Sequence, residues 1–129
     1  METSLAEAKR TILCVDDEAT PMLLRRFVLE KSGFCVLTAA SGQEALQILD
    51  RQPVDLVLTD LLMPGLSGTE LAREVKRRRP ELPVVLLSGV NEIPEDATAA
   101  DLFLSKVEGP EAMCRKLSEI LNGSHDNAA

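Results

Sequence analysis

The sequence has almost no aromatic residues and only one histidine. Its 129 residues include no tryptophan or tyrosine, and aromatics make up 2% of the composition, so we expect an aliphatic core. The histidine, His125, lies in a polar C-terminal stretch, which leaves no His-based catalytic triad or zinc site. The cysteines, Cys14, Cys35 and Cys114, form no CxxC pair and are interpreted as buried free thiols.

Long hydrophobic runs and an excess of basic residues are also missing. No apolar run approaches the roughly 20 residues that cross a bilayer, and residues 1–7 lack the basic start and apolar centre of a secretory signal. The net charge of -7 opposes binding to nucleic-acid phosphates. We therefore expect a cytoplasmic protein that binds neither membranes nor nucleic acid. The basic run Lys76–Arg79 is either a solvated helix C-terminus or a docking patch.

Five short runs of β-branched and aliphatic residues alternate with longer amphipathic segments. The predicted strands are Thr11–Val15, Phe34–Thr38, Asp55–Thr59, Pro83–Leu87 and Asp101–Leu104. Three of these runs are apolar without alternation, which is typical of parallel strands covered by helices on both faces. The pattern predicts an α/β fold, a doubly wound five-stranded parallel sheet with right-handed crossovers.

The segments between the strands carry signals for helix ends. The predicted starts are Thr20-Pro21, the capping-box pairs Ser41/Glu44 and Ser67/Glu70, and Pro110. Gly33 and Gly123 are interpreted as terminators, with the last helix ending near Leu121. The fourth helix is expected to be short or irregular, since Pro94 leaves at most about two turns. We expect one domain, residues 9–122, with flexible ends at residues 1–8 and 123–129.

Polar side chains stand where four of the predicted strands end. Asp16 and Asp17 follow the first strand, while Asp60, Ser88 and Lys106 follow the third, fourth and fifth. In a doubly wound sheet of order 2-1-3-4-5 these ends are neighbours. Three converging carboxylates repel one another, so a compensating cation is expected, and an oxygen-rich pocket suits Mg²⁺.

These residues together are suited to phosphoryl chemistry. Asp60 is placed as a nucleophile that accepts a phosphoryl group, with Lys106 and the Ser88 hydroxyl contacting its oxygens. Each residue alone also has an ordinary explanation. Asp16 and Asp17 fit a helix N-cap pair, Ser88 a turn and Lys106 a solvated surface. Such explanations become much less probable when all four strand ends are taken together.

The same positions make the chain resemble the receiver domain of two-component response regulators, over residues 9–122. The matching residues are Asp16-Asp17-Glu18, Asp60, Met63-Pro64-Gly65, Gly68, Ser88-Gly89, Phe103 and Lys106. The resemblance implies a flavodoxin-like receiver fold of sheet order 2-1-3-4-5. It also implies that Asp60 is the phosphoacceptor, which takes its phosphoryl group from a histidine kinase, a phosphotransfer protein or a small phosphodonor.

Further roles follow from the resemblance alone. Asp17 would bind Mg²⁺ directly and Asp16 mainly through water, while the backbone carbonyl of Leu62 would complete the protein's ligands. Ser88 and Phe103 would form a switch pair that turns toward the site on phosphorylation. For Phe103, a simple core ring on the last strand is the alternative.

Three departures from the family pattern affect these expectations. Val107 follows Lys106 where the family usually has proline, so the sequence leaves both a cis and a trans peptide open, and a trans peptide would displace the lysine somewhat. The stretch from Ser88 to Lys106 is shorter than usual by about a turn of helix. No further domain follows the fifth helix, so we expect a stand-alone receiver, a monomer or weak homodimer that signals by contacting another protein.

The leading hypothesis is a phosphorylation-controlled signalling switch in a phosphorelay, not a metabolic enzyme. Leu62 and Val90 are apolar residues near the site, and we predict that they hinder an attacking water and prolong the aspartyl phosphate. A phosphorylation-independent scaffold or dimerisation receiver is the nearest alternative. A phosphohydrolase is a third, which Leu61 and Leu62 disfavour because turnover usually needs an acid–base residue beside the nucleophile.

Overall fold

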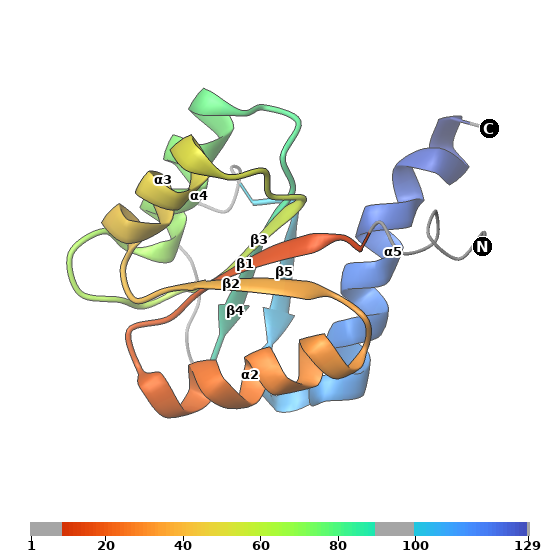
Figure 1. Cartoon of the computed structure of the whole chain (residues 1–129), viewed down its shortest axis with the longest axis horizontal. Helices are drawn as coiled ribbons and strands as arrows, with labels where there is room; N and C mark the ends of the chain where they lie inside the picture. Colours follow the sequence, from red (N-terminus) through yellow and green to blue (C-terminus); the bar gives the residue numbers. More distant parts are fainter. Residues whose placement is uncertain (1–8, 90–99, 129) are drawn as a thin grey trace.

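A computed structural model describes residues 9–89 and 100–128, without the side chains of residues 124–128. Its elements are β1 (Thr11–Val15), α2 (Ala19–Lys31), β2 (Cys35–Ala39), α3 (Gly42–Arg51), β3 (Leu56–Asp60), α4 (Gly68–Arg78), β4 (Val84–Ser88), β5 (Leu102–Ser105), the 3₁₀ helix η1 (Lys106–Glu108) and α5 (Pro110–Ala128). Figure 1 shows a central sheet between two layers of helices.

The sheet has the predicted topology. Its order is β2-β1-β3-β4-β5 and every adjacent pair is parallel. Helices α2 and α5 lie on one face, and α3 and α4 lie on the other (Figure 1). The doubly wound arrangement is therefore confirmed, and the carboxyl ends of β1 and β3 flank the position where the strand order reverses.

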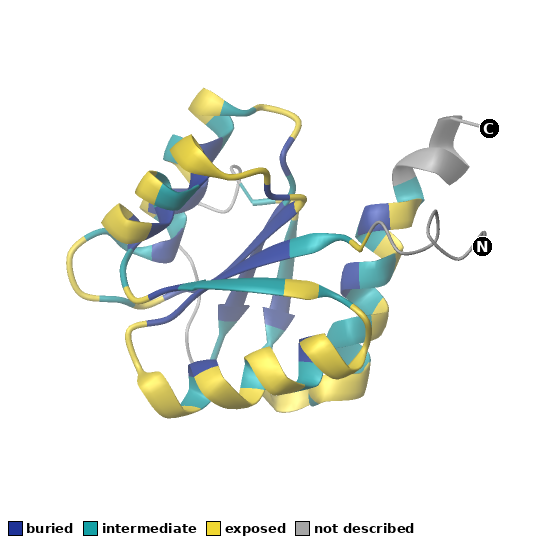
Figure 2. Ribbon diagram, viewed as in Figure 1, coloured by how far each residue is buried: buried dark blue, intermediate teal, exposed yellow. Residues whose placement is uncertain are grey.

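Alternate residues of each central strand enter two separate cores. Leu13 and Val15 of β1 pack with the buried residues of α3 and α4, whereas Ile12 and Cys14 pack with those of α2 and α5. Both faces of the strand are thus apolar, which explains its unbroken hydrophobic run. Figure 2 shows the buried residues concentrated along the central strands and on the inward sides of the helices.

Four of the five strands begin and end one residue later than predicted. The aspartates assigned to the strand starts act instead as backbone acceptors. The Asp55 carboxylate accepts the Thr11 N–H at 2.7 Å, and the Asp101 carboxylate accepts the Val84 N–H at 2.7 Å. Each aspartate thereby accepts a hydrogen bond from the backbone N–H of the first residue of a neighbouring strand. The shift makes Asp60 and Ser88 the last residues of their strands.

The predicted start of the first helix was wrong by two residues. Helix α2 has Glu18 as its N-cap, so Pro21 is its third residue and not its first. The Asp16 carboxylate accepts the Glu18 N–H at 2.9 Å, a local turn that brings the chain into the helix before Thr20.

The other predicted starts are confirmed in most details. Ser67 and Glu70 form a complete capping box, and α5 begins at Pro110. Ser41 accepts the Glu44 N–H at 3.1 Å, but the Glu44 carboxylate bonds the N–H of Ala40 instead of that of Ser41.

Of the two predicted terminators, only one ends a helix. Gly33 follows the C-cap of α2 with a φ of +100°, a left-handed conformation that favours glycine. The prediction for Gly123 was wrong, because α5 continues to Ala128 and includes most of the segment interpreted as a flexible tail. A helix tolerates one glycine at a cost of about 1 kcal/mol, and no proline follows to stop it.

The prediction of buried thiols holds for only one cysteine. Cys14 is buried, and its burial raises the pKa of the thiol to about 12. Cys35 is exposed at the start of the edge strand β2, and Cys114 is partly exposed beside the Ser32 hydroxyl, 3.2 Å away.

Some predictions fall outside the described residues. These concern the flexible N-terminus at residues 1–8, the short fourth helix and Val90. None of the helices that the structure describes combines the length and the apolar composition that a bilayer crossing requires.

Candidate functional site

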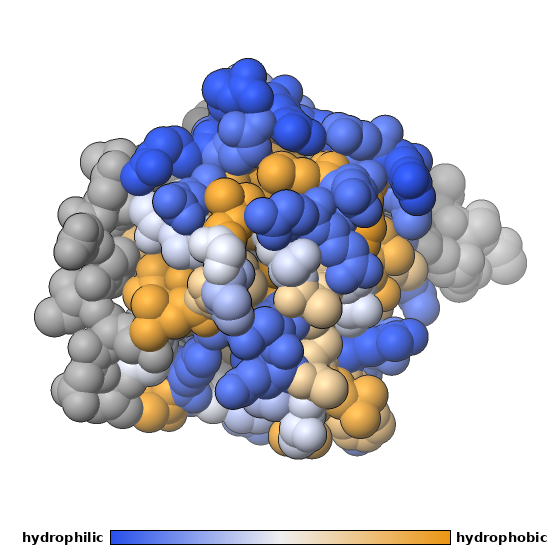
Figure 3. All heavy atoms as spheres, turned by 90° about the vertical axis from the view of Figure 1, so that its left-hand side faces the viewer, coloured by the Kyte–Doolittle hydropathy of each residue, from blue (hydrophilic) through white to orange (hydrophobic). Residues whose placement is uncertain are grey.

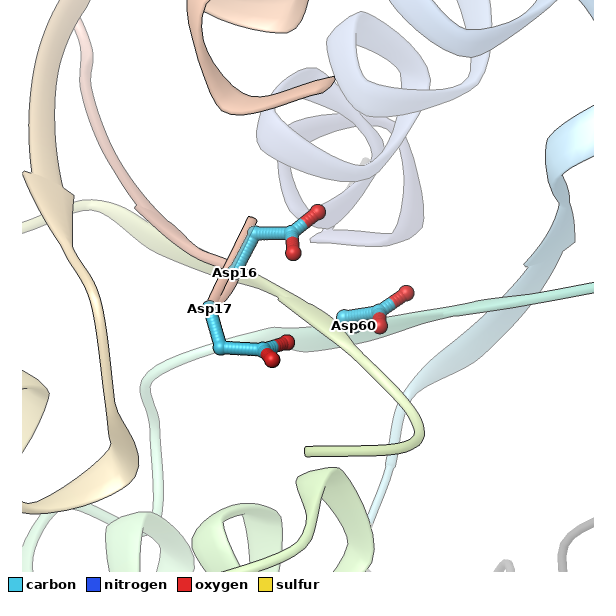
Figure 4. Close-up of side chains that lie close together, drawn as sticks. All are labelled: Asp16, Asp17 and Asp60. Atoms are coloured by element: carbon cyan, nitrogen blue, oxygen red, sulfur yellow. The ribbon is translucent and has the colours of Figure 1, made fainter. Parts of the chain in front are cut away.

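The predicted carboxylates come together at the carboxyl end of the sheet. Asp16 follows β1 and Asp60 ends β3, and Val15 pairs with Thr59 in the register of these neighbouring strands. One ligand atom from each of Asp16, Asp17 and Asp60 lies within 4.8 Å of the others. Figure 4 shows the three carboxylates side by side, with Asp16 and Asp17 on the chain that leaves β1.

Burial makes this cluster electrostatically costly. Asp16 is 3% exposed and Asp60 is 6% exposed, whereas Asp17 is exposed. Burial is the main cause that raises the pKa of Asp60 above its ordinary value, and the Asp16 charge adds to it. The hydrogen bond and positive charge of Lys106 oppose this effect and lower the pKa. The ionised form of Asp60 is therefore destabilised by its surroundings, and a bound cation or a covalent partner would relieve this cost.

Lys106 forms an ion pair with the predicted phosphoacceptor. Its Nζ atom lies 2.5 Å from Asp60 Oδ1, and its side chain is 37% exposed. The Lys106–Val107 peptide, which the sequence left open, is trans. The residue begins η1, and the Ser105 hydroxyl accepts the Val107 N–H at 3.2 Å, which fixes the turn after β5. The Lys106 ammonium group therefore contacts Asp60 although no proline follows the lysine.

The other predicted residues lie on the same edge or next to it. Ser88 ends β4, one residue after Leu87, which pairs with Asp60 in the sheet register. Phe103 of β5 pairs with Leu86 of β4 and is half-buried, so it is not a fully enclosed core ring. Leu62 follows the acceptor by two residues, with its side chain 57% exposed. The switch roles and the Leu62 carbonyl ligand stay predictions.

The donor set fits a magnesium ion. All three side chains offer carboxylate oxygens, the ligand type that Mg²⁺ prefers. Apart from the ion pair with Lys106, no hydrogen-bond donor among the described residues satisfies the buried Oδ1 atom of Asp60. A pocket with excess negative charge and an exposed member, Asp17, is accessible to a hydrated cation.

Gly68 holds the loop after the acceptor against α4. Its N–H donates to the Leu61 carbonyl at 2.9 Å. A Cβ atom at this position would clash with the Asp60 carbonyl oxygen and would lie 2.9 Å from Leu61 Cα. Only glycine allows the helix to start this close to the acceptor strand. The sequence resemblance included Gly68 but gave no physical reason for it.

One charged residue of the site was missed in the sequence. Arg25 of α2 places its Nη1 atom 3.1 Å from Asp16 Oδ2, and the two side chains are 10% and 2% exposed. The sequence does contain a signal for Arg25, because this cation lies on the same side of α2 as Met22 and Leu29, the buried residues of that helix. Helical spacing of three and four residues puts all three on the inward face.

Comparisons with known proteins agree with this geometry. The family model of the response regulator receiver domain matches residues 12–118. The transcriptional regulatory protein GlrR of Escherichia coli is 33% identical over 117 residues, which cover 88% of this chain and 26% of GlrR. This chain spans about half or less of the length of the other curated relatives that it matches.

Solved structures show the same fold. A response regulator receiver domain protein from Clostridium thermocellum has a TM-score of 0.82 and 31% identity, with 90% of this chain and 97% of that chain covered. The response regulator TrrA of Thermotoga maritima, in complex with Mg²⁺ and BeF, has a TM-score of 0.80 and 31% identity, with 85% and 97% covered. The chain therefore belongs to the response regulator receiver domain family.

Proposed function

We propose that this receiver is a phosphorylation-controlled switch, in which Asp60 accepts a phosphoryl group from a histidine kinase or a phosphotransfer protein. The observation that carries the proposal is the buried Asp60 carboxylate, paired with Lys106 at 2.5 Å and flanked by two further carboxylates. Burial of an ionised group is costly and is retained where it serves chemistry.

The transfer follows from the position of Asp60. A carboxylate oxygen attacks the phosphorus of a phosphohistidine, the new P–O bond forms and the P–N bond breaks. The imidazole nitrogen keeps the electron pair of the broken bond and takes up a proton. Lys106, already within 2.5 Å of Asp60, is placed to pair with a phosphoryl oxygen after transfer.

The metal ligands in this proposal are Asp17 and Asp60 directly, Asp16 mainly through water, and the Leu62 backbone carbonyl. When bound, Mg²⁺ supplies positive charge that stabilises the transferring phosphoryl group. The Mg²⁺–BeF complex of the related TrrA protein supports this part of the proposal.

The switch in this proposal consists of Ser88 and Phe103. Transfer replaces the single negative charge of the Asp60 carboxylate by the nearly two charges of an acyl phosphate, and the Ser88 hydroxyl can donate to one of the new oxygens. Ser88 and Phe103 lie on adjacent strands, and neither residue is fully buried. The local charge is thereby converted into a change on the outer surface.

Output through protein–protein contacts fits the surface. Five large hydrophobic residues are exposed among the described ones: Leu23, Leu24, Phe27, Leu62 and Val107. Figure 3 shows one face on which apolar and hydrophilic side chains are interspersed. We further propose a cytoplasmic location, a monomeric or weakly dimeric state, and no metabolic activity beyond self-catalysed phosphotransfer and autodephosphorylation. Several curated relatives are transcriptional regulators.

Intact-protein mass spectrometry after incubation with acetyl phosphate tests the proposal. We expect the wild-type protein to gain the mass of one phosphoryl group in Mg²⁺ but not in EDTA, and Asp60→Asn to gain none. Asp50→Asn is the matched control, because Asp50 is an exposed aspartate that pairs with Arg78 at 3.3 Å.

The outcomes also separate the alternative functions. No Mg²⁺-dependent mass gain and no response to beryllofluoride would favour a phosphorylation-independent scaffold. Sustained release of phosphate over many turnovers would favour a phosphohydrolase. A stoichiometric gain that Asp60→Asn abolishes supports the switch.

A further inference from the structure

We propose that Arg25 is a resident cation of the acceptor pocket, which neutralises Asp16 and thereby lowers the affinity of the carboxylate cluster for Mg²⁺. This inference rests on the proposed magnesium site and goes beyond it. It assigns to a residue of α2 the control of how readily the pocket takes up the metal.

The contacts of Asp16 carry the first step. Its Oδ2 atom pairs with Arg25 Nη1 at 3.1 Å, and its Oδ1 atom accepts the Glu18 N–H at 2.9 Å. Both oxygens therefore have protein donors. A cation near Asp16 meets a carboxylate whose charge is already partly compensated and whose orientation is fixed from two sides.

The burial of Arg25 carries the second step. Its side chain is only 10% exposed although it extends from the apolar stripe of α2 between Met22 and Leu29. A guanidinium remains charged at any pH at which the protein folds. Burying this charge is costly unless a carboxylate compensates it, so Arg25 and Asp16 depend on each other.

The position of Arg25 beside Lys106 carries the third step. Arg25 lines the same hollow as Lys106, Leu87 and Ser105. Lys106 in turn pairs with Asp60 Oδ1 at 2.5 Å, as Arg25 pairs with Asp16. Three carboxylates therefore face two fixed cations, which leaves one net negative charge to attract a metal instead of two.

Calorimetric titration with MgCl₂ at fixed ionic strength tests the inference. We expect Arg25→Met to bind Mg²⁺ at least about fivefold more tightly than the wild type, because one compensating charge is removed. Arg25→Gln, which keeps a hydrogen-bond donor but not the charge, should shift the affinity in the same direction. Arg25→Lys, which keeps the positive charge, should stay within about twofold of the wild type.

Arg77 of α4 provides the matched control. Its Nη2 atom pairs with the Glu74 carboxylate at 2.5 Å, away from the carboxylate cluster, and its side chain is 71% exposed. Arg77→Met removes the same charge from the protein but not from the pocket, so its Mg²⁺ affinity should equal that of the wild type.

Thermal unfolding gives a second readout that does not depend on phosphorylation. In EDTA, Arg25→Met should melt at a lower temperature than the wild type, since Asp16 loses its partner. Saturating Mg²⁺ should raise its melting temperature more than that of the wild type.

Equal or weaker Mg²⁺ binding by both Arg25→Met and Arg25→Gln would overturn the inference while leaving the proposed switch intact. Absence of Mg²⁺ binding in the wild type and in every variant would overturn both. If Arg25→Met does not fold in EDTA, Arg25→Gln and Arg25→Lys still distinguish a charge effect from no effect.

Discussion

Two groups of charged residues in this protein have opposite surroundings. At the carboxyl end of the sheet, Asp60 is buried among other carboxylates, and its pKa is raised mainly by burial. At the C-terminal end of α4, Glu74 lies between arginines, with its carboxylate 2.9 Å from Arg78 Nε. Hydrogen bonds from Arg77 and Arg78 hold the pKa of Glu74 at about 2, and the bond from Arg77 has the larger effect.

The end of α4 explains the basic run of the sequence. Lys76 contacts the Asp101 carboxylate and the Leu82 carbonyl at 2.7 Å each, and Arg79 donates to the Leu49 carbonyl at 2.6 Å. The run is a helix C-terminus, the first of the two interpretations, with its cations bonded within the molecule. Charges are satisfied at the end of α4 and left under-compensated at the end of the sheet, which marks the latter as the functional region.

Of the substitutions that separate the two regions, Gly68→Ala should have the largest effect, because it disrupts the acceptor region and not the end of α4. The added methyl group clashes with the Asp60 backbone, so we expect a loss of about 3 kcal/mol of unfolding free energy and weaker phosphorylation. Urea denaturation and mass spectrometry measure the two effects. Gly123→Ala, in open space on α5, is the control and should be neutral or stabilising by up to about 1 kcal/mol. Equal stability of Gly68→Ala and the wild type would contradict the close packing.

Asp60→Asn tests whether the acceptor carboxylate destabilises the metal-free protein. Because the folded pKa is raised above 3.8, the folded state retains a proton that the unfolded chain has lost. Stability therefore falls as the pH rises from about 4 through the raised pKa. We expect Asp60→Asn to remove this fall and to be more stable than the wild type in EDTA at neutral pH. Urea denaturation at several pH values measures it, and lower stability at neutral pH would refute the prediction.

Leu62→Asn tests whether the loop beside the acceptor limits hydrolysis. Leu62 is exposed two residues after Asp60, and a polar side chain there can position a water for attack. We expect autodephosphorylation to accelerate by up to about tenfold, equivalent to about 1.4 kcal/mol in the barrier. The decay of the phosphoprotein after removal of acetyl phosphate gives the rate. Leu23→Asn, at a similarly exposed leucine of α2, is the control, and an unchanged rate for Leu62→Asn would remove Leu62 from this role.

Glu74→Gln should have the smallest effect. Its ion pairs are on the surface, where such contacts add little to stability. Its pKa is lowered from 4.5 to about 2, so its contribution is present above pH 4.5 and is lost as the pH falls toward 2. We expect unchanged Mg²⁺ binding and phosphorylation, and a small loss of stability in urea that disappears near pH 2. A change in Mg²⁺ affinity would show that the two regions are coupled.

The sequence predicted the sheet because its signals are local and repeated. The apolar run before Asp60 could be recognised without knowledge of any neighbour, and so could the capping box of Ser67 and Glu70. The end of the last helix was not predictable in this way. Gly123 is compatible with a terminator or with a helix interior, and the choice depends on the residues that follow it.

The candidate site was likewise predicted in part from local sequence signals and in part not at all. Asp16, Asp17, Asp60 and Lys106 were found because each stands at the end of a recognisable strand, and parallel strands present these ends at one edge. The contact of Arg25 with Asp16 could not be predicted, because the local sequence of a helix does not determine the angle at which it packs on a sheet. The clash that requires Gly68 likewise involves two segments separated by a loop.

The sequence by itself determined the order of strands and helices and the carboxylates of the acceptor edge, since these follow from periodicity and position along the chain, and its motif residues carried the resemblance to the family. Only the tertiary structure decided the charge balance of that edge. It buried Asp60 against Lys106 and brought Arg25 to Asp16. Electrostatic energies depend on distance and burial, and both are fixed only when α2, β1, β3 and η1 have packed together.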